Sequence, residues 1–237
     1  MPNSSTKAMI LTGGSGTLGT ELRHIGKDND CMFISPTSNE CNILVYRDVL
    51  RTLSKYKCDT VVHAAAATDV SGLENDLIKA FEVNVVGTFN ILKACVELDK
   101  NLVYISTDYV FDGSSGPYQT SDAINPLSVY AKSKASAELM VRAYDKSTII
   151  RTSFFGHEFP HGAAFTDQWS SKDYVDEIAP KIIKCLKSGE RGIFHIGSPR
   201  RTIYEIAKTR SPDVDKVSRT IINHQVPEDT SLVLSDF

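Results

Sequence analysis

A cluster of hydroxyl and acidic side chains follows an apolar run in the middle of the chain. Residues 103–105 (Val-Tyr-Ile) are typical of a buried strand and are followed by Ser106, Thr107, Asp108 and Tyr109. Open α/β sheets bind their ligands at the carboxyl ends of the strands. A threonine hydroxyl at such a position can hydrogen-bond a substrate carbonyl oxygen. We therefore expect a substrate site here, with Asp108 and Tyr109 facing the groups that flank the carbonyl.

A tyrosine and a lysine four residues apart could complete this chemistry. Tyr130 and Lys134 share one face of any helix that contains both. A free tyrosine has a pKa of about 10, and an ammonium group one turn away should lower that value. Tyr130 could then deliver a proton to the carbonyl oxygen while a nicotinamide cofactor delivers hydride to the carbon. Alone this pair is common on solvated helix faces; with Thr107 it predicts a reductase site.

The glycine-rich stretch "TGGSGTLG" predicts where the cofactor binds. Gly13, Gly16 and Gly19 follow an apolar run and open an amphipathic segment, which is the strand-loop-helix setting of dinucleotide-binding sites. The first glycine permits a tight turn, the second lets the backbone approach a pyrophosphate, and the third lets the helix pack on the strand. Backbone N–H groups and the helix dipole would then face the anion.

The end of the next apolar run indicates the type of cofactor. An acidic residue there would bind the 2′-hydroxyl of NAD, but the stretch "SPTSNE" places hydroxyls at its tip, beginning with Ser35. This favours NADPH, with NADH also possible. Arg23 or Lys27 could supply the positive charge for a 2′-phosphate.

The remaining pattern predicts a fold that brings these residues together. Strands are expected at 7–13, 31–35, 59–66, 101–107 and 147–153, and helices at 16–26, 76–98 and 125–144. This alternation indicates a parallel sheet covered on both faces, a Rossmann-type doubly wound α/β fold.

The second part of the chain has weaker periodicity. We expect a loop at 154–171, a helix at 174–189, a strand at 192–198 and a helix at 202–210. The predicted domains are a dinucleotide-binding domain at 1–153 and a mostly small substrate-binding lobe at 154–237. Strands and helices of the later segments can also join the first domain.

Composition excludes several other functions. The 237 residues have 41% hydrophobic and 23% charged residues and a net charge of −3, with no basic block for nucleic acid or a membrane surface. The first residues form a polar tail rather than a signal peptide. Five cysteines without a paired spacing indicate reduced thiols in a cytoplasmic protein.

A few further residues could bind ligands, but each also has a purely structural interpretation. His157 and His161 lack the additional ligands of a metal site, so no metal is expected. Trp169 is expected to pack the small lobe. The stretch "SPRR" at 198–201 ends in two arginines that could either be solvated or bind a diphosphate.

The chain resembles the extended short-chain dehydrogenase/reductases, and within them the dTDP-4-dehydrorhamnose reductases. The resemblance is carried by "TGGSGTLG", "VVHAAAATDV", "NVVGT", "ISTDYVFDG", "NPLSVYAKSKASAE", "RTSFF" and "PEDTSL", which span nearly the whole chain. The segment between Phe155 and Asp167 is short for this family.

The resemblance implies a role for each matching position. The catalytic residues would be Thr107, Tyr130 and Lys134. The cofactor-binding residues would be Gly13, Ser15, Gly16, Thr17, Leu18, Gly19, Ser35, Asn42, Ile43, His63, Ala64, Ala65, Ala66, Asn84 and Ser106, together with Tyr130 and Lys134. The substrate-binding residues would be Val70, Thr107, Asp108, Tyr109 and Phe154, and Asn42 stands where the family usually has an adenine-contacting Asp.

The implied activity is NAD(P)H-dependent reduction of the 4-keto group of a 4-keto-6-deoxy sugar that is linked to a nucleoside diphosphate, either dTDP or UDP. The resemblance also implies a homodimer. Related 4,6-dehydratases carry Asp-Glu after the threonine, whereas this chain has Asp108 and Tyr109. The bifunctional 3,5-epimerase/4-reductases place Cys at the Asp108 position. Three alternatives remain open: such a bifunctional enzyme, a 4-epimerase that retains NAD, and a non-catalytic dinucleotide-binding subunit resembling methionine adenosyltransferase β.

Overall fold

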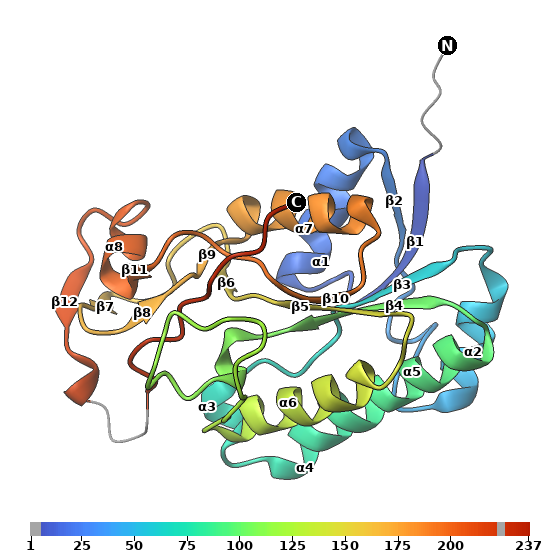
Figure 1. Cartoon of the computed structure of the whole chain (residues 1–237), viewed down its shortest axis with the longest axis horizontal. Helices are drawn as coiled ribbons and strands as arrows, with labels where there is room; N and C mark the ends of the chain where they lie inside the picture. The colour runs from blue at the N-terminus through green and yellow to red at the C-terminus, as the bar shows by residue number, and fades with distance from the viewer. Residues whose placement is uncertain (1–5, 222–225) are drawn as a thin grey trace.

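The computed structural model describes residues 6–221 and 226–237, and a six-stranded parallel sheet forms its centre (Figure 1). In sheet order the strands are β10 (Gly192–His195), β5 (Ser147–Arg151), β4 (Asn101–Ser106), β3 (Thr60–His63), β1 (Lys7–Thr12) and β2 (Cys31–Ile34). The chain moves to one side from β1 to β2 and then to the other side at β3. The carboxyl ends of β1 and β3 therefore flank the crevice in which such sheets bind ligands.

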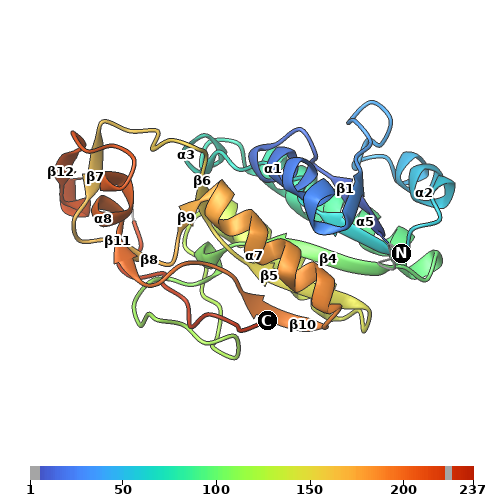
Figure 2. The same ribbon diagram turned by 90° about the horizontal axis from the view of Figure 1, so that it is seen from above.

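Helices cover both faces of this sheet (Figures 1 and 2). One face carries α1 (Thr17–Gly26) and α7 (Val175–Ser188), and the other carries α2 (Tyr46–Lys55), α5 (Gly87–Glu97) and α6 (Val129–Arg142). Alternate strand residues serve the two cores: Met9 and Leu11 pack against the α1 side, and Ile10 packs against the α2 side. Both faces are thus buried, which confirms the predicted doubly wound α/β fold and explains the continuous apolar runs.

Three helical predictions need correction. The segment predicted as one helix at 76–98 consists of α4 (Leu77–Phe81), a π-helical turn (Glu82–Val86) and α5. The helix expected from residue 125 begins at Val129, because the Ser128 hydroxyl caps it by accepting a hydrogen bond from Ala131 N at 3.1 Å. Helix α2 was not predicted, although Tyr46, Val49, Leu50 and Leu53 stand at helical spacing and pack in the core on this side of the sheet.

The segment 154–171, predicted as loop, contains three short strands. These are β6 (Phe154–Phe155), β7 (Ala163–Phe165) and β8 (Trp169–Ser170), which pair respectively with β9 (Asp173–Tyr174), β12 (Asp215–Val217) and β11 (Arg201–Thr202). Strands of two or three residues have no detectable periodicity, so only their distant partners define them. With α8 (Ile203–Lys208), they build a small unit beside the carboxyl end of the sheet (Figure 2).

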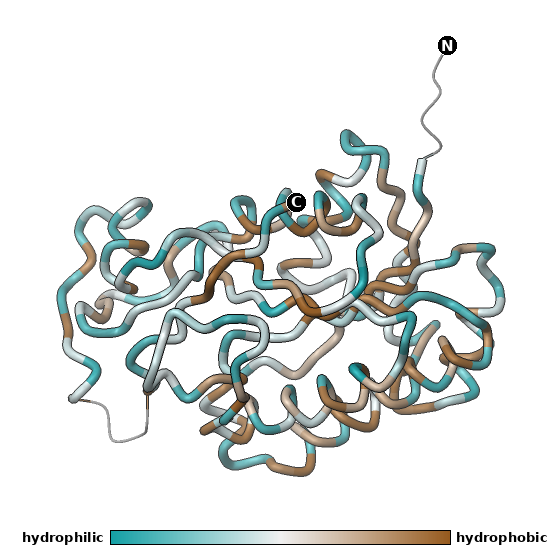
Figure 3. Tube along the Cα trace, viewed as in Figure 1, coloured by the Kyte–Doolittle hydropathy of each residue, from teal (hydrophilic) through white to brown (hydrophobic). Residues whose placement is uncertain are grey.

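The chain passes between the sheet unit and the small unit more than once. Helix α7 and strand β10 come after residue 153 but belong to the large sheet unit. The C-terminal residues run back from the small unit along this sheet, where Ser235 N donates to His195 O at 3.0 Å (Figure 1). Apolar residues are concentrated on the strands of the central sheet (Figure 3). Within the described residues, no helix is long and apolar enough to cross a membrane.

Candidate active site

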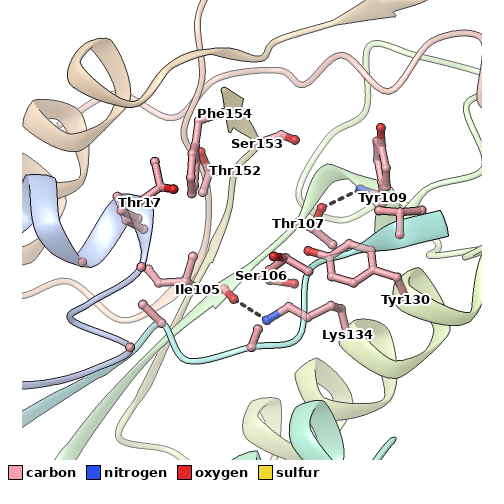
Figure 4. A pocket seen from close by; sticks show the side chains of 18 of the residues that line it. Thr17, Ile105, Ser106, Thr107, Tyr109, Tyr130, Lys134, Thr152, Ser153 and Phe154 are labelled. Atoms are coloured by element: carbon pink, nitrogen blue, oxygen red, sulfur yellow. Dashed lines mark hydrogen bonds between the residues drawn. The ribbon is translucent and has the colours of Figure 1, made fainter. Parts of the chain in front are cut away.

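A cavity of about 390 Å³ lies between the carboxyl end of the sheet and the small unit. This volume falls in the range of small-molecule sites. Its wall combines the glycine loop, the ends of β3 and β4, helix α6 and the segment after β5 (Figure 4). Residues from distant parts of the sequence are therefore brought to one site, where the topology predicts ligand binding.

The glycine loop fits a dinucleotide pyrophosphate. Gly13 has a φ of +76°, and a Cβ added there would lie 2.5 Å from Ala65 N. A Cβ at Gly19 would lie 2.2 Å from Gly13 O, so that glycine is required for α1 to pack against the loop. The loop thus presents bare backbone at the N-terminus of a ten-residue helix, an arrangement suited to an anion.

We expect Gly13→Ala to weaken NADPH binding by about tenfold or more, because left-handed backbone costs a non-glycine residue ~1–2 kcal/mol and the new methyl group meets the loop after β3. Titration of cofactor fluorescence measures this affinity. Gly162→Ala is the matched control, because nothing lies within 4 Å of its added Cβ. Equal NADPH affinity in Gly13→Ala and the parent would contradict this function of the loop.

Thr107, Tyr130 and Lys134 converge on the floor of the cavity (Figure 4). Thr107 directly follows β4, and its Oγ1 accepts a hydrogen bond from Tyr109 N at 3.2 Å. Lys134 lies one turn beyond Tyr130 on α6 and donates its Nζ hydrogen to Ile105 O at 2.7 Å. The strand end and the helix are thereby held together, and the two hydroxyls face the same space.

The electrostatics of this group differ from the sequence-based expectation. Desolvation raises the pKa of Tyr130 well above its ordinary value, and a hydrogen bond with Thr107 opposes this shift only partly. Burial lowers the pKa of Lys134 to about 7. The predicted lowering of the tyrosine pKa by Lys134 is therefore wrong for the protein without ligands. A protonated Tyr130 at neutral pH suits proton donation to a developing alkoxide.

Asp108 does not face the cavity as expected. Its side chain is fully buried, and its Oδ2 accepts hydrogen bonds from Thr230 Oγ1 at 3.0 Å and Ser170 Oγ at 3.3 Å. Thr107 Oγ1 lies 3.2 Å from Asp108 Oδ1. Asp108 thus joins the end of β4 to β8 and to the C-terminal segment, beside Thr107, and it does not line the cavity.

Two polar residues that the resemblance assigns to the cofactor, His63 and Asn84, form hydrogen bonds inside the protein. His63 is buried between the Thr12 and Thr88 hydroxyls at 2.7 and 3.0 Å, and burial lowers its pKa to about 3, so it is neutral. Asn84, in the π-helical turn, bonds both backbone groups of Ala67 and, at 2.9 Å, Ser133 Oγ. These contacts hold the loop after β3 and helix α6 in place. Neither His63 nor Asn84 lines the cavity.

The other predicted positions divide into two groups, and their individual roles stay predictions. Those that line the cavity are Gly13, Gly16, Thr17, Leu18, Gly19, Ala64, Ala66, Val70, Ser106, Tyr109 and Phe154. Those outside its lining are Ser15, Ser35, Asn42, Ile43 and Ala65. Ser35 packs against the glycine loop, since a Cβ added to Gly14 would lie only 1.6 Å from Ser35 Oγ. Ile43 instead packs against Gly87 on α5.

The cavity also contains residues that sequence reasoning missed. They are Thr68, Ile105, Thr152, Ser153, Gly156 and Lys172. The segment after β5 gave a signal in the sequence, because Thr152 and Ser153 are the last residues of a predicted strand, just as Thr107 is. Lys172 gave none, since it follows a segment without periodicity.

The residues with competing interpretations have defined partners. Arg200 stacks on Trp169, with its guanidinium carbon 3.8 Å from the ring centroid, and it pairs with Asp229 at 2.8 Å. Arg201 pairs with Asp173 at 2.6 Å. His157 faces Glu21 at 3.2 Å, and in the described part of the chain no group of three or more metal-ligating side chains occurs. The "SPRR" arginines are therefore engaged within the protein, as is Trp169.

The fold and the site define a class: a nicotinamide-dependent Rossmann-fold oxidoreductase of the extended short-chain dehydrogenase/reductase type. Within that class, the chain belongs to the RmlD substrate binding domain family, whose model matches residues 7–210.

Two curated relatives illustrate this membership. The spore coat polysaccharide biosynthesis protein SpsK of Bacillus subtilis (strain 168) is 34% identical over 210 residues, covering 80% of this chain and 73% of SpsK. The dTDP-4-dehydrorhamnose reductase of Aggregatibacter actinomycetemcomitans is 31% identical over 224 residues, covering 84% of this chain and 76% of that protein.

A solved structure agrees with the fold. The crystal structure of dTDP-4-dehydrorhamnose reductase from Bacillus anthracis str. Ames, in complex with NADP, superposes with a TM-score of 0.87 at 24% identity, covering 97% of this chain and 91% of that one. The chain is only distantly similar to the regulatory subunit considered as an alternative. Methionine adenosyltransferase 2 subunit beta of Bos taurus is 26% identical, covering 86% of this chain and 71% of that protein.

Proposed function

We propose that this protein reduces the 4-keto group of a nucleoside-diphosphate 4-keto-6-deoxy sugar with NADPH, giving a rhamnose-type sugar nucleotide. The observation that carries the proposal is the convergence of the Thr107 and Tyr130 hydroxyls in one cavity with the bare glycine loop. The names of the Aggregatibacter and Bacillus anthracis proteins support the substrate class, and the NADP bound to the latter supports the cofactor.

The chain's own residues would act on the substrate carbonyl as follows. When bound, the reduced nicotinamide supplies hydride to sugar carbon 4. Thr107 and Tyr130 hold the carbonyl oxygen by hydrogen bonds, and the Tyr130 Oη proton passes to that oxygen as the C–H bond forms, which yields a hydroxyl group. Lys134, one turn from Tyr130, can bind the nicotinamide ribose and help return a proton to the phenolate.

Two features favour simple reduction over the related reactions. Elimination of water needs a second acid-base residue beside Asp108, and this position is Tyr109. Epimerisation at carbons 3 and 5 needs a side chain that reaches the ring carbons, whereas the Asp108 carboxylate is buried among hydroxyls. A monofunctional reductase therefore accounts best for the site.

The preference for NADPH should depend on Arg23. A Cβ added to Gly14 would lie 3.5 Å from Arg23 Cδ and would also clash with the Ser35 hydroxyl. Both side chains therefore border the glycine loop. We expect Arg23→Ala to reduce the ratio of kcat/KM for NADPH to that for NADH by about ten- to a hundredfold, the value of one charge-assisted phosphate contact. Lys27→Ala tests the other cation that the sequence suggested for the 2′-phosphate, and it should leave the ratio unchanged. An unchanged ratio in Arg23→Ala would assign the 2′-phosphate to another group.

The substrate is tested by following oxidation of NADPH and NADH with dTDP- and UDP-linked 4-keto-6-deoxy sugars, each supplied before and after 3,5-epimerisation. Turnover of the epimerised sugar alone is the expected result and also identifies the nucleotide. Turnover of the unepimerised sugar would reveal an epimerase activity or a different product. Tightly retained NAD in the purified protein would instead indicate a 4-epimerase.

We also propose that the protein forms a homodimer and is located in the cytoplasm. Formation of a homodimer is supported by exposed apolar side chains on α5 and α6, including Phe89, Val96 and Leu139. A cytoplasmic location is supported by the nucleotide-sugar substrate and by the five cysteines, all buried and unpaired in the described part of the chain.

A further inference from the structure

Lys172 brings a positive charge into the wall of the cavity from the small unit. It connects β8 to β9, is half-buried and lines the same cavity as Thr107 and Tyr130. Its backbone N donates to Ser170 Oγ at 3.0 Å, which fixes the start of its side chain. Its Nζ lies 4.7 Å from the Phe155 ring centroid and 5.5 Å from that of Tyr109. Two aromatic rings therefore hold the ammonium group near the cavity.

This charge lacks the partners that neighbouring cations have. Across residues 6–221 and 226–237, no carboxylate lies within 4.0 Å of the Lys172 ammonium, and it donates no hydrogen bond to a protein group. Arg200 and Arg201, by contrast, each form an ion pair. The other cation of the cavity, Lys134, is buried and bonded to Ile105 O. Lys172 is thus positioned to receive an anion from the cavity.

The groups around Lys172 indicate which anion it would bind. The cofactor pyrophosphate has its own site at the glycine loop. Tyr109 is a neighbour of both the catalytic tyrosine and Lys172, because its ring centroid is 6.4 Å from that of Tyr130 and 5.5 Å from the Lys172 ammonium. A hexose whose carbon 4 is at Tyr130 carries its diphosphate on carbon 1, at the opposite side of the sugar ring. A sugar placed along Tyr109 would therefore direct this group toward Lys172.

We infer that Lys172 binds the diphosphate of the sugar nucleotide and thereby selects nucleotide-linked sugars over free ones. The inference rests on the proposed function and extends it to a residue that the catalytic pattern does not include. A half-buried ammonium binds phosphate oxygens more strongly than a solvated surface lysine does, because less water competes for the charge.

The test is calorimetric titration of the NADP⁺-loaded protein with dTDP and with UDP. We expect Lys172→Gln to weaken binding of the preferred nucleotide by about ten- to a hundredfold. Lys172→Arg should recover most of the affinity, because the charge is retained. NADPH affinity should stay unchanged in both variants. Lys132→Gln is the matched control, since Lys132 is an exposed lysine on α6 that does not line the cavity.

Each alternative result contradicts a different statement. If the parent protein binds dTDP or UDP and Lys172→Gln binds it equally well, the role of Lys172 is wrong while the reductase proposal stands. If Lys172→Gln instead loses NADPH affinity, the lysine serves the cofactor. If the parent binds NADPH but neither nucleotide, the proposed substrate class fails together with the inference. Thermal melting of Lys172→Gln excludes loss of folding as the cause.

Discussion

The Tyr130→Phe protein should reduce its sugar nucleotide with a kcat about 10²- to 10⁴-fold below that of the parent, because it retains the ring but lacks the proton that the new hydroxyl group needs. NADPH affinity should change little, since the glycine loop and Lys134 are untouched. Single-turnover measurements of NADPH oxidation under saturating substrate report this step directly.

The comparison for this variant is Tyr56→Phe, which removes a tyrosine hydroxyl at the end of α2, away from the cavity. That protein should retain the parent rate. If Tyr130→Phe also retained it, another group would have to donate the proton and the assignment of Tyr130 would be wrong. If it lost cofactor binding as well, the residue would serve the binding of NADPH in addition to the chemistry.

The second large effect is expected at the buried pair behind the active site. Arg151 and Glu138 are both fully buried, with Arg151 Nη2 2.7 Å from Glu138 Oε1. The carboxylate also accepts a hydrogen bond from Ser106 Oγ at 2.6 Å, directly before Thr107. We expect Arg151→Met to lower the free energy of unfolding by about 3–5 kcal/mol, because it leaves a buried carboxylate without its counter-charge. Urea denaturation followed by circular dichroism measures this change.

Two further variants separate charge from packing. The double variant Arg151→Met/Glu138→Leu should recover part of the lost stability, because no unpaired charge remains in the core. Arg51→Met, which breaks the exposed pair with Asp48, should cost less than about 1 kcal/mol. A loss for Arg151→Met as small as that for Arg51→Met would show that the buried pair contributes little to stability.

Much of the sheet unit could be predicted from sequence because its determinants are local. Continuous apolar runs indicate strands buried on both faces, and the glycine loop needs only its own spacing to define a strand-loop-helix turn. The spacing of Tyr130 and Lys134 likewise follows from helix geometry. These short-range rules identified Thr107, Tyr130, Lys134 and the three loop glycines, which all line one cavity in the structure.

The features that sequence reasoning missed depend on contacts between distant residues. The strands of the small unit are defined by partners such as Asp215–Val217, some fifty residues from the strand that they pair with. Asp108 looked like a ligand-facing residue, but Thr230 from the C-terminal segment binds its carboxylate. The pKa of Tyr130 is governed by desolvation, which the distance to Lys134 along the chain does not reveal.

The central claim is that hydride passes from NADPH to carbon 4 of a nucleotide-linked keto sugar while Tyr130 protonates the oxygen. It is tested most directly by incubating the protein with NADPH deuterated at both C4 positions of the nicotinamide and analysing the sugar nucleotide by mass spectrometry and NMR. The account predicts one deuterium, located on sugar carbon 4, and oxidised cofactor in equal amount. A protein that binds both ligands but leaves the sugar unlabelled would contradict it and favour a regulatory dinucleotide-binding role.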